Sequence, residues 1–101
     1  MKASITIVEL EQLRSKKNNI MVIDVRTKEE YNQKHIPFAG NLPIEIIEAG
    51  NFIPEPSKIV ITVCGKGGGR SETAAKYLRE NTNNEVYFLD GGTFGWTESK
   101  D

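Results

Sequence analysis

The sequence is poor in thiol and imidazole groups, with one cysteine, Cys64, and one histidine, His35. A single cysteine excludes an intrachain disulfide and any redox motif that needs a cysteine pair. The two residues together are too few for a structural zinc site, so we expect no metal. A chain without disulfide-forming pairs is typical of a reducing compartment, and we expect a cytoplasmic location.

An excess of positive charge is also missing, since 13 Lys and Arg residues stand against 14 Asp and Glu residues, for a net charge of −1. This balance argues against nucleic acid or an anionic membrane as a partner. The longest apolar runs, 20–23 and 86–89, have four residues each, whereas a membrane-spanning helix needs roughly 18. Ser4, Thr6 and Glu9 interrupt any signal-peptide core. We therefore expect a soluble protein without a leader in this sequence.

What the sequence does contain is an alternation of strand-like and helix-like segments. Strand-like runs occupy residues 5–8, 20–25, 58–63 and 86–89. Helical spacing or helix-end signals mark residues 9–17, 27–36, 42–50 and 71–80. This alternation predicts a single α/β domain over residues 1–101, with three layers and a central, mainly parallel sheet flanked by helices.

Local signals predict where several helices begin and end. Thr27 and Glu30 form a Thr-x-x-Glu capping box, in which each side chain satisfies a backbone N–H of the other residue. Pro37 should end that helix. Pro43 should open the next short helix and Gly50 should close it.

Polar side chains follow the predicted strands at Asp24, Cys64 and Asp90. Ligands of parallel α/β sheets bind at the carboxyl ends of the strands, so these positions direct the search for a site to one edge. Cys64 is followed by Gly65-Lys66-Gly67-Gly68-Gly69-Arg70-Ser71, a glycine-rich turn before a predicted helix.

Such a turn is suited to binding an anion. Successive backbone N–H groups and the positive end of a helix dipole converge there, and glycine permits positive φ and close approach of the main chain. Ser71 could supply a capping hydroxyl. Lys66 and Arg70 add charge, and this environment favours Cys64 as a thiolate nucleophile over an inert buried cysteine. The phosphate-binding pattern G-x-x-x-x-G-K-[ST] is not met, because Lys66 precedes most of the glycines.

These segments, in this order, resemble rhodanese-like domains. Cys64 to Ser71 looks like the family's active-site loop, and Asp24-Val25-Arg26 with Glu30 looks like its DVR…E element. The segment from His35-Ile36-Pro37 to Pro43 is similar to its HIPGA-x-N-x-P motif, and Gly91-Gly92 with Trp96 is similar to its terminal GG…W. The resemblance spans residues 20 to 96.

The resemblance implies a sulfurtransferase with no metal or organic cofactor. Cys64 would take the outer sulfur of a small anionic donor such as thiosulfate, become a persulfide, and pass the sulfur to a thiol or cyanide-like acceptor or to a sulfur-relay protein. The amides of Gly65 to Arg70 would stabilise the bound sulfur. Lys66 and Arg70 would bind the donor.

Two alternatives stay open. Five residues separate Cys64 from Arg70, the C-x5-R spacing of related phosphatases, so a phosphatase or arsenate reductase is the second candidate. Phosphoester cleavage usually needs an acid for the leaving oxygen, and Gly65 to Gly69 contains neither Asp nor Glu. A non-catalytic sulfur carrier or binding module is the third candidate.

Other polar and aromatic residues are expected to play structural parts. Arg26 and Glu30 should form a surface ion pair and cap that brace the turn after the strand. Asp24 should support the loop and not act in catalysis, and His35 should be structural. Phe94 and Trp96 should pack in the core or at the rim, where an aromatic ring could line the mouth of the pocket.

Overall fold

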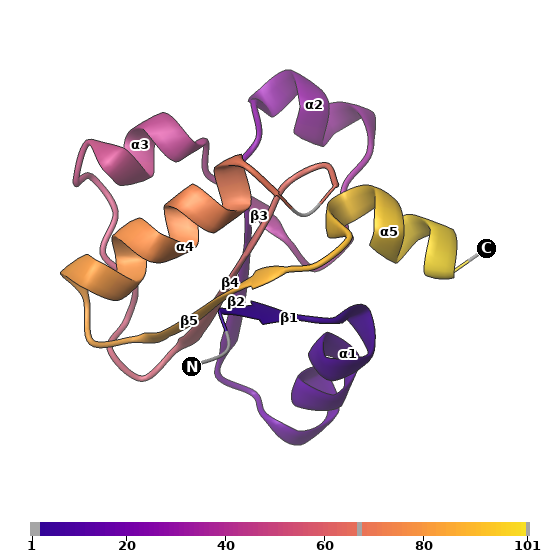
Figure 1. The fold of residues 1–101 in the computed structure, drawn as a ribbon, viewed down its shortest axis with the longest axis horizontal. Coiled ribbons are helices and arrows are strands. Elements are labelled where there is room, and N and C mark those ends of the chain that lie inside the picture. The colour runs from indigo at the N-terminus through magenta and orange to yellow at the C-terminus, as the bar shows by residue number, and fades with distance from the viewer. Residues whose placement is uncertain (1–2, 67, 101) are drawn as a thin grey trace.

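Strands and helices alternate along the chain in the computed structural model, which describes residues 3–66 and 68–100 (Figure 1). The elements in order are β1 (Ser4–Ile5), α1 (Ile7–Lys16), β2 (Ile20–Asp24), α2 (Lys28–Gln33), β3 (Gly40–Asn41), α3 (Ile44–Glu48), β4 (Ile59–Val63), α4 (Arg70–Asn81), β5 (Glu85–Leu89) and α5 (Gly92–Ser99). The predicted helix signals at 27–36, 42–50 and 71–80 correspond to α2, α3 and α4.

The strands form one parallel five-stranded sheet in the order β1-β5-β4-β2-β3. β4 lies in the middle, and each of its five residues is buried. A strand covered on both faces needs apolar side chains on both, which explains its unbroken β-branched run. All pairings among the described strands are parallel, so the predicted α/β class and sheet are confirmed.

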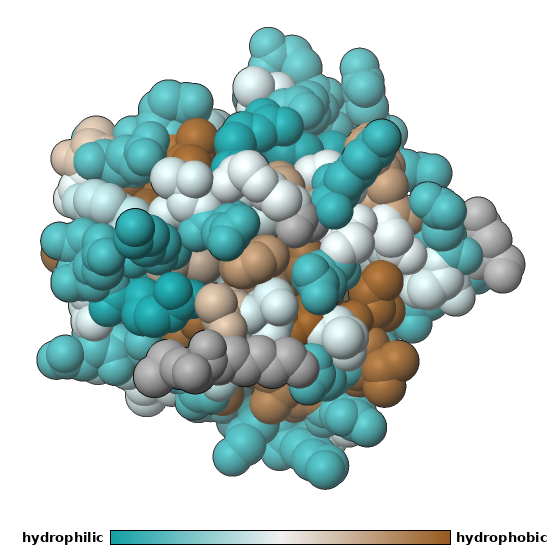
Figure 2. All heavy atoms as spheres, viewed as in Figure 1, coloured by the Kyte–Doolittle hydropathy of each residue, from teal (hydrophilic) through white to brown (hydrophobic). Residues whose placement is uncertain are grey.

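Helices cover both faces of the sheet, which gives three layers (Figure 1). Successive residues of a strand point to opposite faces: Val60 packs with side chains of α3 and α4, such as Ile47 and Leu78, whereas Ile61 packs with Leu10 of α1. In Figure 1, α3 and α4 lie on one side of the sheet and α1 and α5 on the other. The face seen in Figure 2 is mainly hydrophilic, and apolar side chains show between the polar ones.

The N-terminal segment differs from its prediction as a strand over residues 5–8. β1 ends at Ile5, and Ile7 and Val8 belong to α1. The cause is a second capping box, in which the Thr6 hydroxyl accepts from the Glu9 amide at 3.1 Å and a Glu9 carboxylate oxygen accepts from the Thr6 amide at 2.8 Å. This local helix signal prevails over the β propensity of Ile7 and Val8.

Two elements were absent from the sequence predictions. The pair β2–β3 involves two residues of each strand, Ile23 with Gly40 and Asp24 with Asn41. The C-terminal helix α5 begins after Gly91, which has φ 85°. A positive φ suits glycine as the residue that turns the chain into a helix.

In the described part of the chain, no helix is both long and apolar enough to cross a membrane.

Candidate functional site

The predicted edge of the sheet brings together the ends of three strands and the starts of two helices. Cys64 follows β4 directly, Asp24 is the last residue of β2, and α5 begins shortly after β5. Two described residues from the end of β4 to the first turn of α4 contact neighbouring helices: Arg70 pairs with Glu30 of α2, and the Gly65 carbonyl accepts from the Phe94 amide of α5. Asp90, also expected here, is exposed, and its amide donates to the Ile5 carbonyl.

The Cys64 thiol is buried beneath the loop, with 5% of the residue exposed. Its Sγ donates to the Gly68 carbonyl at 2.8 Å and lies 3.2 Å from the Ser71 Oγ. The Ser71 Oγ donates to the same carbonyl at 3.2 Å, as does the Ser71 amide. Cys64 and Ser71 therefore share one hydrogen-bond acceptor, the Gly68 carbonyl.

Ser71 does not have its predicted place as the helix cap. Gly69 is the residue before α4, with φ 45°, and Ser71 is the second residue of the helix, fully buried. A positive φ is unfavourable for residues with a side chain, so glycine is suited to position 69. Because Gly69 takes the cap position, the Ser71 hydroxyl can contact Cys64. The prediction of Ser71 as a cap is wrong, and its hydroxyl instead lies 3.2 Å from the Cys64 Sγ.

The glycines of the loop serve different purposes. A Cβ on Gly65 would lie 3.2 Å from Cε2 of Phe94, so Gly65 allows close contact with that ring. Gly68 has open space where a side chain would be, and it contributes its carbonyl. Positive φ is needed at Gly69 among the described loop glycines. Gly67, also predicted to bind substrate, lies outside the described residues.

The first turn of α5 is joined to the cysteine loop. The Thr93 amide donates to the Cys64 carbonyl at 2.8 Å, and the Phe94 amide donates to the Gly65 carbonyl at 3.0 Å. The Phe94 ring is 40% exposed and packs against Gly65, with the Arg26 Cζ 5.8 Å from its centroid. Phe94 thus lies at the rim of the loop, and the Thr93 amide fixes the backbone of Cys64.

Asp24 and Arg26 form a fully buried ion pair below the loop. The Arg26 Nη2 donates to Asp24 Oδ2 at 2.8 Å and the Nε donates to Oδ1 at 2.9 Å. The Thr93 hydroxyl adds a donor to Asp24 at 3.3 Å, and Arg26 also donates to the Lys34 carbonyl. The Asp24 carboxylate thus braces its own turn, where Oδ1 also accepts from the Arg26 amide, and it is linked to α5 through Thr93. The prediction of Arg26 in a surface pair with Glu30 is wrong.

Glu30 pairs with Arg70 instead. The Arg70 Nη1 donates to Glu30 Oε1 at 2.8 Å and Nη2 donates to Oε2 at 3.0 Å. Hydrogen bonds from Arg70, and then from the Thr27 amide, lower the pKa of Glu30 to about 2. The pKa of Arg70 is raised, first by Glu30 and, more weakly, by the charges of Cys64 and Asp24. Two of the Arg70 nitrogens are thus engaged by a carboxylate.

Lys66, His35 and Trp96 are the remaining residues to which the sequence assigned a role. Lys66 is exposed on the loop. The His35 Nδ1 lies 2.8 Å from the Tyr31 carbonyl and its ring stacks on Tyr31, which agrees with a structural role. Trp96 packs partly buried against the sheet face that α1 covers. In the described residues, His, Cys, Asp and Glu side chains do not gather into a group of three that could hold a metal.

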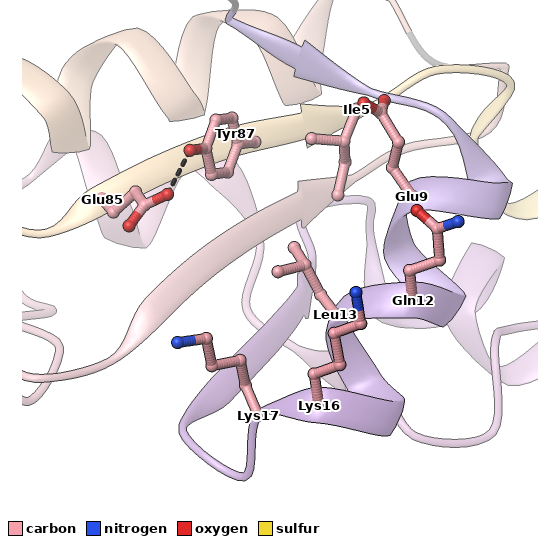
Figure 3. Close-up of a pocket in the computed structure, with 8 residues that line it drawn as sticks. All are labelled: Ile5, Glu9, Gln12, Leu13, Lys16, Lys17, Glu85 and Tyr87. Atoms are coloured by element: carbon pink, nitrogen blue, oxygen red, sulfur yellow. Dashed lines mark hydrogen bonds between the residues drawn. The ribbon is translucent and has the colours of Figure 1, made fainter.

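The hollow drawn in Figure 3 lies away from the cysteine loop, between α1 and the edge of β5. Its volume is about 380 Å³, and its lining includes Lys16, Lys17 and Leu13 but no residue of 64–71. The Tyr87 hydroxyl donates to Glu85 there, and this hydrogen bond raises the pKa of Tyr87 to about 12 (Figure 3). A neutral Tyr87 hydroxyl does not act as a general base. The residues that line this hollow therefore suggest no catalytic site.

The family model described as "Rhodanese-like domain" matches residues 6–99. The chain belongs to the rhodanese-like domain family. This rhodanese-like chain is 32% identical over 97 residues to thiosulfate sulfurtransferase GlpE of Shewanella oneidensis, an alignment that covers 94% of this chain and 92% of that protein.

One further relative and one solved structure are similar to this chain. Adenylyltransferase and sulfurtransferase uba4 of Ogataea parapolymorpha is 29% identical over 94 residues, which are 93% of this chain but 24% of that protein. The human single-domain sulfurtransferase TSTD1 superposes with a TM-score of 0.86 at 20% identity, with 100% of both chains covered. At that identity the second likeness concerns the fold alone.

Proposed function

We propose that this rhodanese-like chain is a sulfurtransferase in which Cys64 carries the sulfur as a persulfide. The observation that supports this most is the position of the Cys64 sulfur, at the start of α4, 3.2 Å from the Ser71 hydroxyl and under a loop that also carries Arg70. The resemblance to named thiosulfate sulfurtransferases over nearly the whole chain supports it independently.

The first half-reaction makes the persulfide. The thiol loses its proton to water, and the Cys64 thiolate attacks the outer sulfur of thiosulfate or of a persulfide donor. The bond between the cysteine sulfur and the donor sulfur forms as the bond from that sulfur to the donor remainder breaks. With thiosulfate, sulfite leaves with the bonding electron pair and Cys64 holds one additional sulfur.

The second half-reaction returns the thiolate. A thiolate or cyanide acceptor attacks the terminal sulfur of the Cys64 persulfide, and the sulfur–sulfur bond breaks with its electron pair going to Cys64. The products are a new persulfide or thiocyanate. Neither half-reaction needs a metal or an organic cofactor, because the sulfur itself accepts the electron pair.

Residues around Cys64 have separate parts in this proposal. Ser71 donates to the Gly68 carbonyl in the structure, and its hydroxyl can turn to donate to Cys64 once the thiol proton has left. The loop amides from Gly65 to Arg70 would stabilise the persulfide, and Lys66 and Arg70 would attract the anionic donor. Thr93 keeps the backbone of Cys64 in place through its amide.

Turnover of thiosulfate with cyanide, followed as thiocyanate, tests the proposal. We expect activity in the native chain and none in Cys64→Ser, while Ser15→Ala, on the exposed end of α1, serves as a control that keeps full activity. An active Cys64→Ser variant, or an inactive native chain with all donors tried, would contradict it. A carrier without catalysis would accept one sulfur and give no turnover.

The C-x5-R spacing keeps a phosphatase as the second candidate. Such an enzyme needs a group that can donate a proton to the leaving oxygen. Asp24 cannot readily do so, because it is fully buried and paired with Arg26. Hydrolysis of p-nitrophenyl phosphate by the native chain without sulfur transfer would favour the phosphatase over the sulfurtransferase.

A further inference from the structure

The Glu30 carboxylate takes part in two interactions, the cap of α2 and the ion pair with Arg70. Within α2 it completes the capping box, since its Oε1 accepts from the Thr27 amide and the Thr27 hydroxyl, each at 3.1 Å. Across the mouth of the loop the same carboxylate accepts from both terminal nitrogens of Arg70, 40 residues further along the chain. The cap therefore fixes the carboxylate, and the carboxylate fixes the guanidinium.

The geometry leaves Arg70 able to bind a second anion. A guanidinium has five N–H groups in a planar fork, and Glu30 uses one face through Nη1 and Nη2. Residues 3–66 and 68–100 provide no hydrogen bond to the Arg70 Nε. The face formed by Nε and its neighbouring Nη is thus directed elsewhere, and a sulfonate oxygen pair can be bound on it in the bidentate manner.

We propose that Glu30 is a positioning residue for anion binding, which orients the Arg70 guanidinium so that its second face meets the oxygens of the sulfur donor. The inference rests on the proposed function for the identity of the donor. Without Glu30 the Arg70 side chain, which is 43% exposed, would sample many rotamers, and part of the binding free energy would be spent on ordering it.

A second reading makes the opposite prediction. If Glu30 acted only as a counter-charge that competes with the donor for Arg70, removing its charge would strengthen anion binding. The sign of the change in affinity therefore separates the two readings.

The chain contains a matched control for the cap itself. Glu9 occupies the same place in the Thr6 capping box of α1 as Glu30 does in α2. Glutamine also completes a capping box, so Glu9→Gln and Glu30→Gln change a helix cap equally, while the second alone alters the contact with Arg70.

The experiment measures thiosulfate binding by calorimetry or NMR titration on a Cys64→Ser background, which binds the donor without reacting. Adding Glu30→Gln should raise the Kd roughly twofold to fivefold, the size expected for one exposed ionic contact, and adding Glu9→Gln should leave it unchanged. On an Arg70→Lys background, Glu30→Gln should have little further effect, because lysine has no fork to orient.

Kinetics of the chain with Cys64 intact supply the second readout. Glu30→Gln should raise the KM for thiosulfate by the same factor and change kcat little. An unchanged or lower Kd in Glu30→Gln, equal effects of Glu9→Gln, or no thiosulfate binding by the Cys64→Ser chain would overturn the inference. If the Kd responds as expected but the native chain transfers no sulfur, the proposed function fails and the inference stands.

Discussion

The two ion pairs beside the cysteine loop have the same shortest N–O distance, 2.8 Å, in opposite surroundings. Asp24 and Arg26 are 0% and 2% exposed at the side chain, whereas Glu30 and Arg70 are 39% and 43% exposed. Removing one partner of a buried pair leaves an uncompensated charge in the interior, whereas water can solvate the remaining charge of an exposed pair. We infer that the first pair fixes the structure and the second is available to a ligand.

Breaking the buried pair should have the largest effect on stability. Arg26→Met would leave the Asp24 carboxylate buried without its partner, and we expect the free energy of unfolding to fall by about 3–5 kcal/mol. Urea denaturation measures this loss. The double variant Asp24→Leu, Arg26→Met leaves no unpaired charge in the interior, so it should recover part of the lost stability. An Arg26→Met chain as stable as the native chain would contradict a structural role for the pair.

A smaller effect is expected where the buried pair meets α5. Thr93→Val removes the hydroxyl that donates to Asp24 at 3.3 Å but keeps the amide on the Cys64 carbonyl. The loss should be about 1 kcal/mol, the usual value of one hydrogen bond, because Arg26 still satisfies Asp24. Thr97→Val, further along α5, is the comparison for a hydroxyl that donates to a backbone carbonyl of its own helix.

The exposed pair should contribute less to stability than to binding. Arg70→Met should change the free energy of unfolding by less than about 1 kcal/mol, while thiosulfate binding weakens much more than in Arg14→Met, a control arginine on α1. Denaturation and titration of the same samples provide both values. A loss of stability as large as in Arg26→Met would remove the distinction between the pairs.

The smallest effect concerns acid pH. The pKa of Glu30 falls from 4.5 to about 2 on folding, chiefly because Arg70 donates to it. A carboxyl with a lowered folded-state pKa contributes stability above the unfolded pKa, and the contribution is lost as the pH falls toward 2. The stability difference between the native chain and Glu30→Gln should therefore shrink over that range, by less than about 1 kcal/mol since both partners are exposed. A difference that stays constant would show that the charge does not matter.

Local sequence patterns predicted much of this fold. The unbroken apolar run of β4 and the capping box of α2 each reflect interactions within a few residues, so both could be found in the sequence. The same holds for Cys64 at the end of a strand. The helix α5 escaped prediction because its sequence, GTFGWTES, has few good helix formers, and the contacts of Thr93 and Phe94 with the loop help to hold it.

The partners of charged residues could not be found in the same way. Arg26 and Glu30 are four positions apart, and their proximity suggested a pair. Arg26 turns instead to Asp24 in the interior, and Glu30 meets Arg70 because folding brings α2 beside the start of α4. Which carboxylate a guanidinium meets depends on this three-dimensional arrangement, which spacing alone does not encode.

The most direct test of sulfur transfer through Cys64 is the intact mass of the chain after treatment with thiosulfate and removal of the excess. We expect one added sulfur atom on the native chain, reversed by cyanide, and no addition to Cys64→Ser. A native chain whose mass is unchanged under conditions in which its thiol is reactive would contradict the persulfide mechanism.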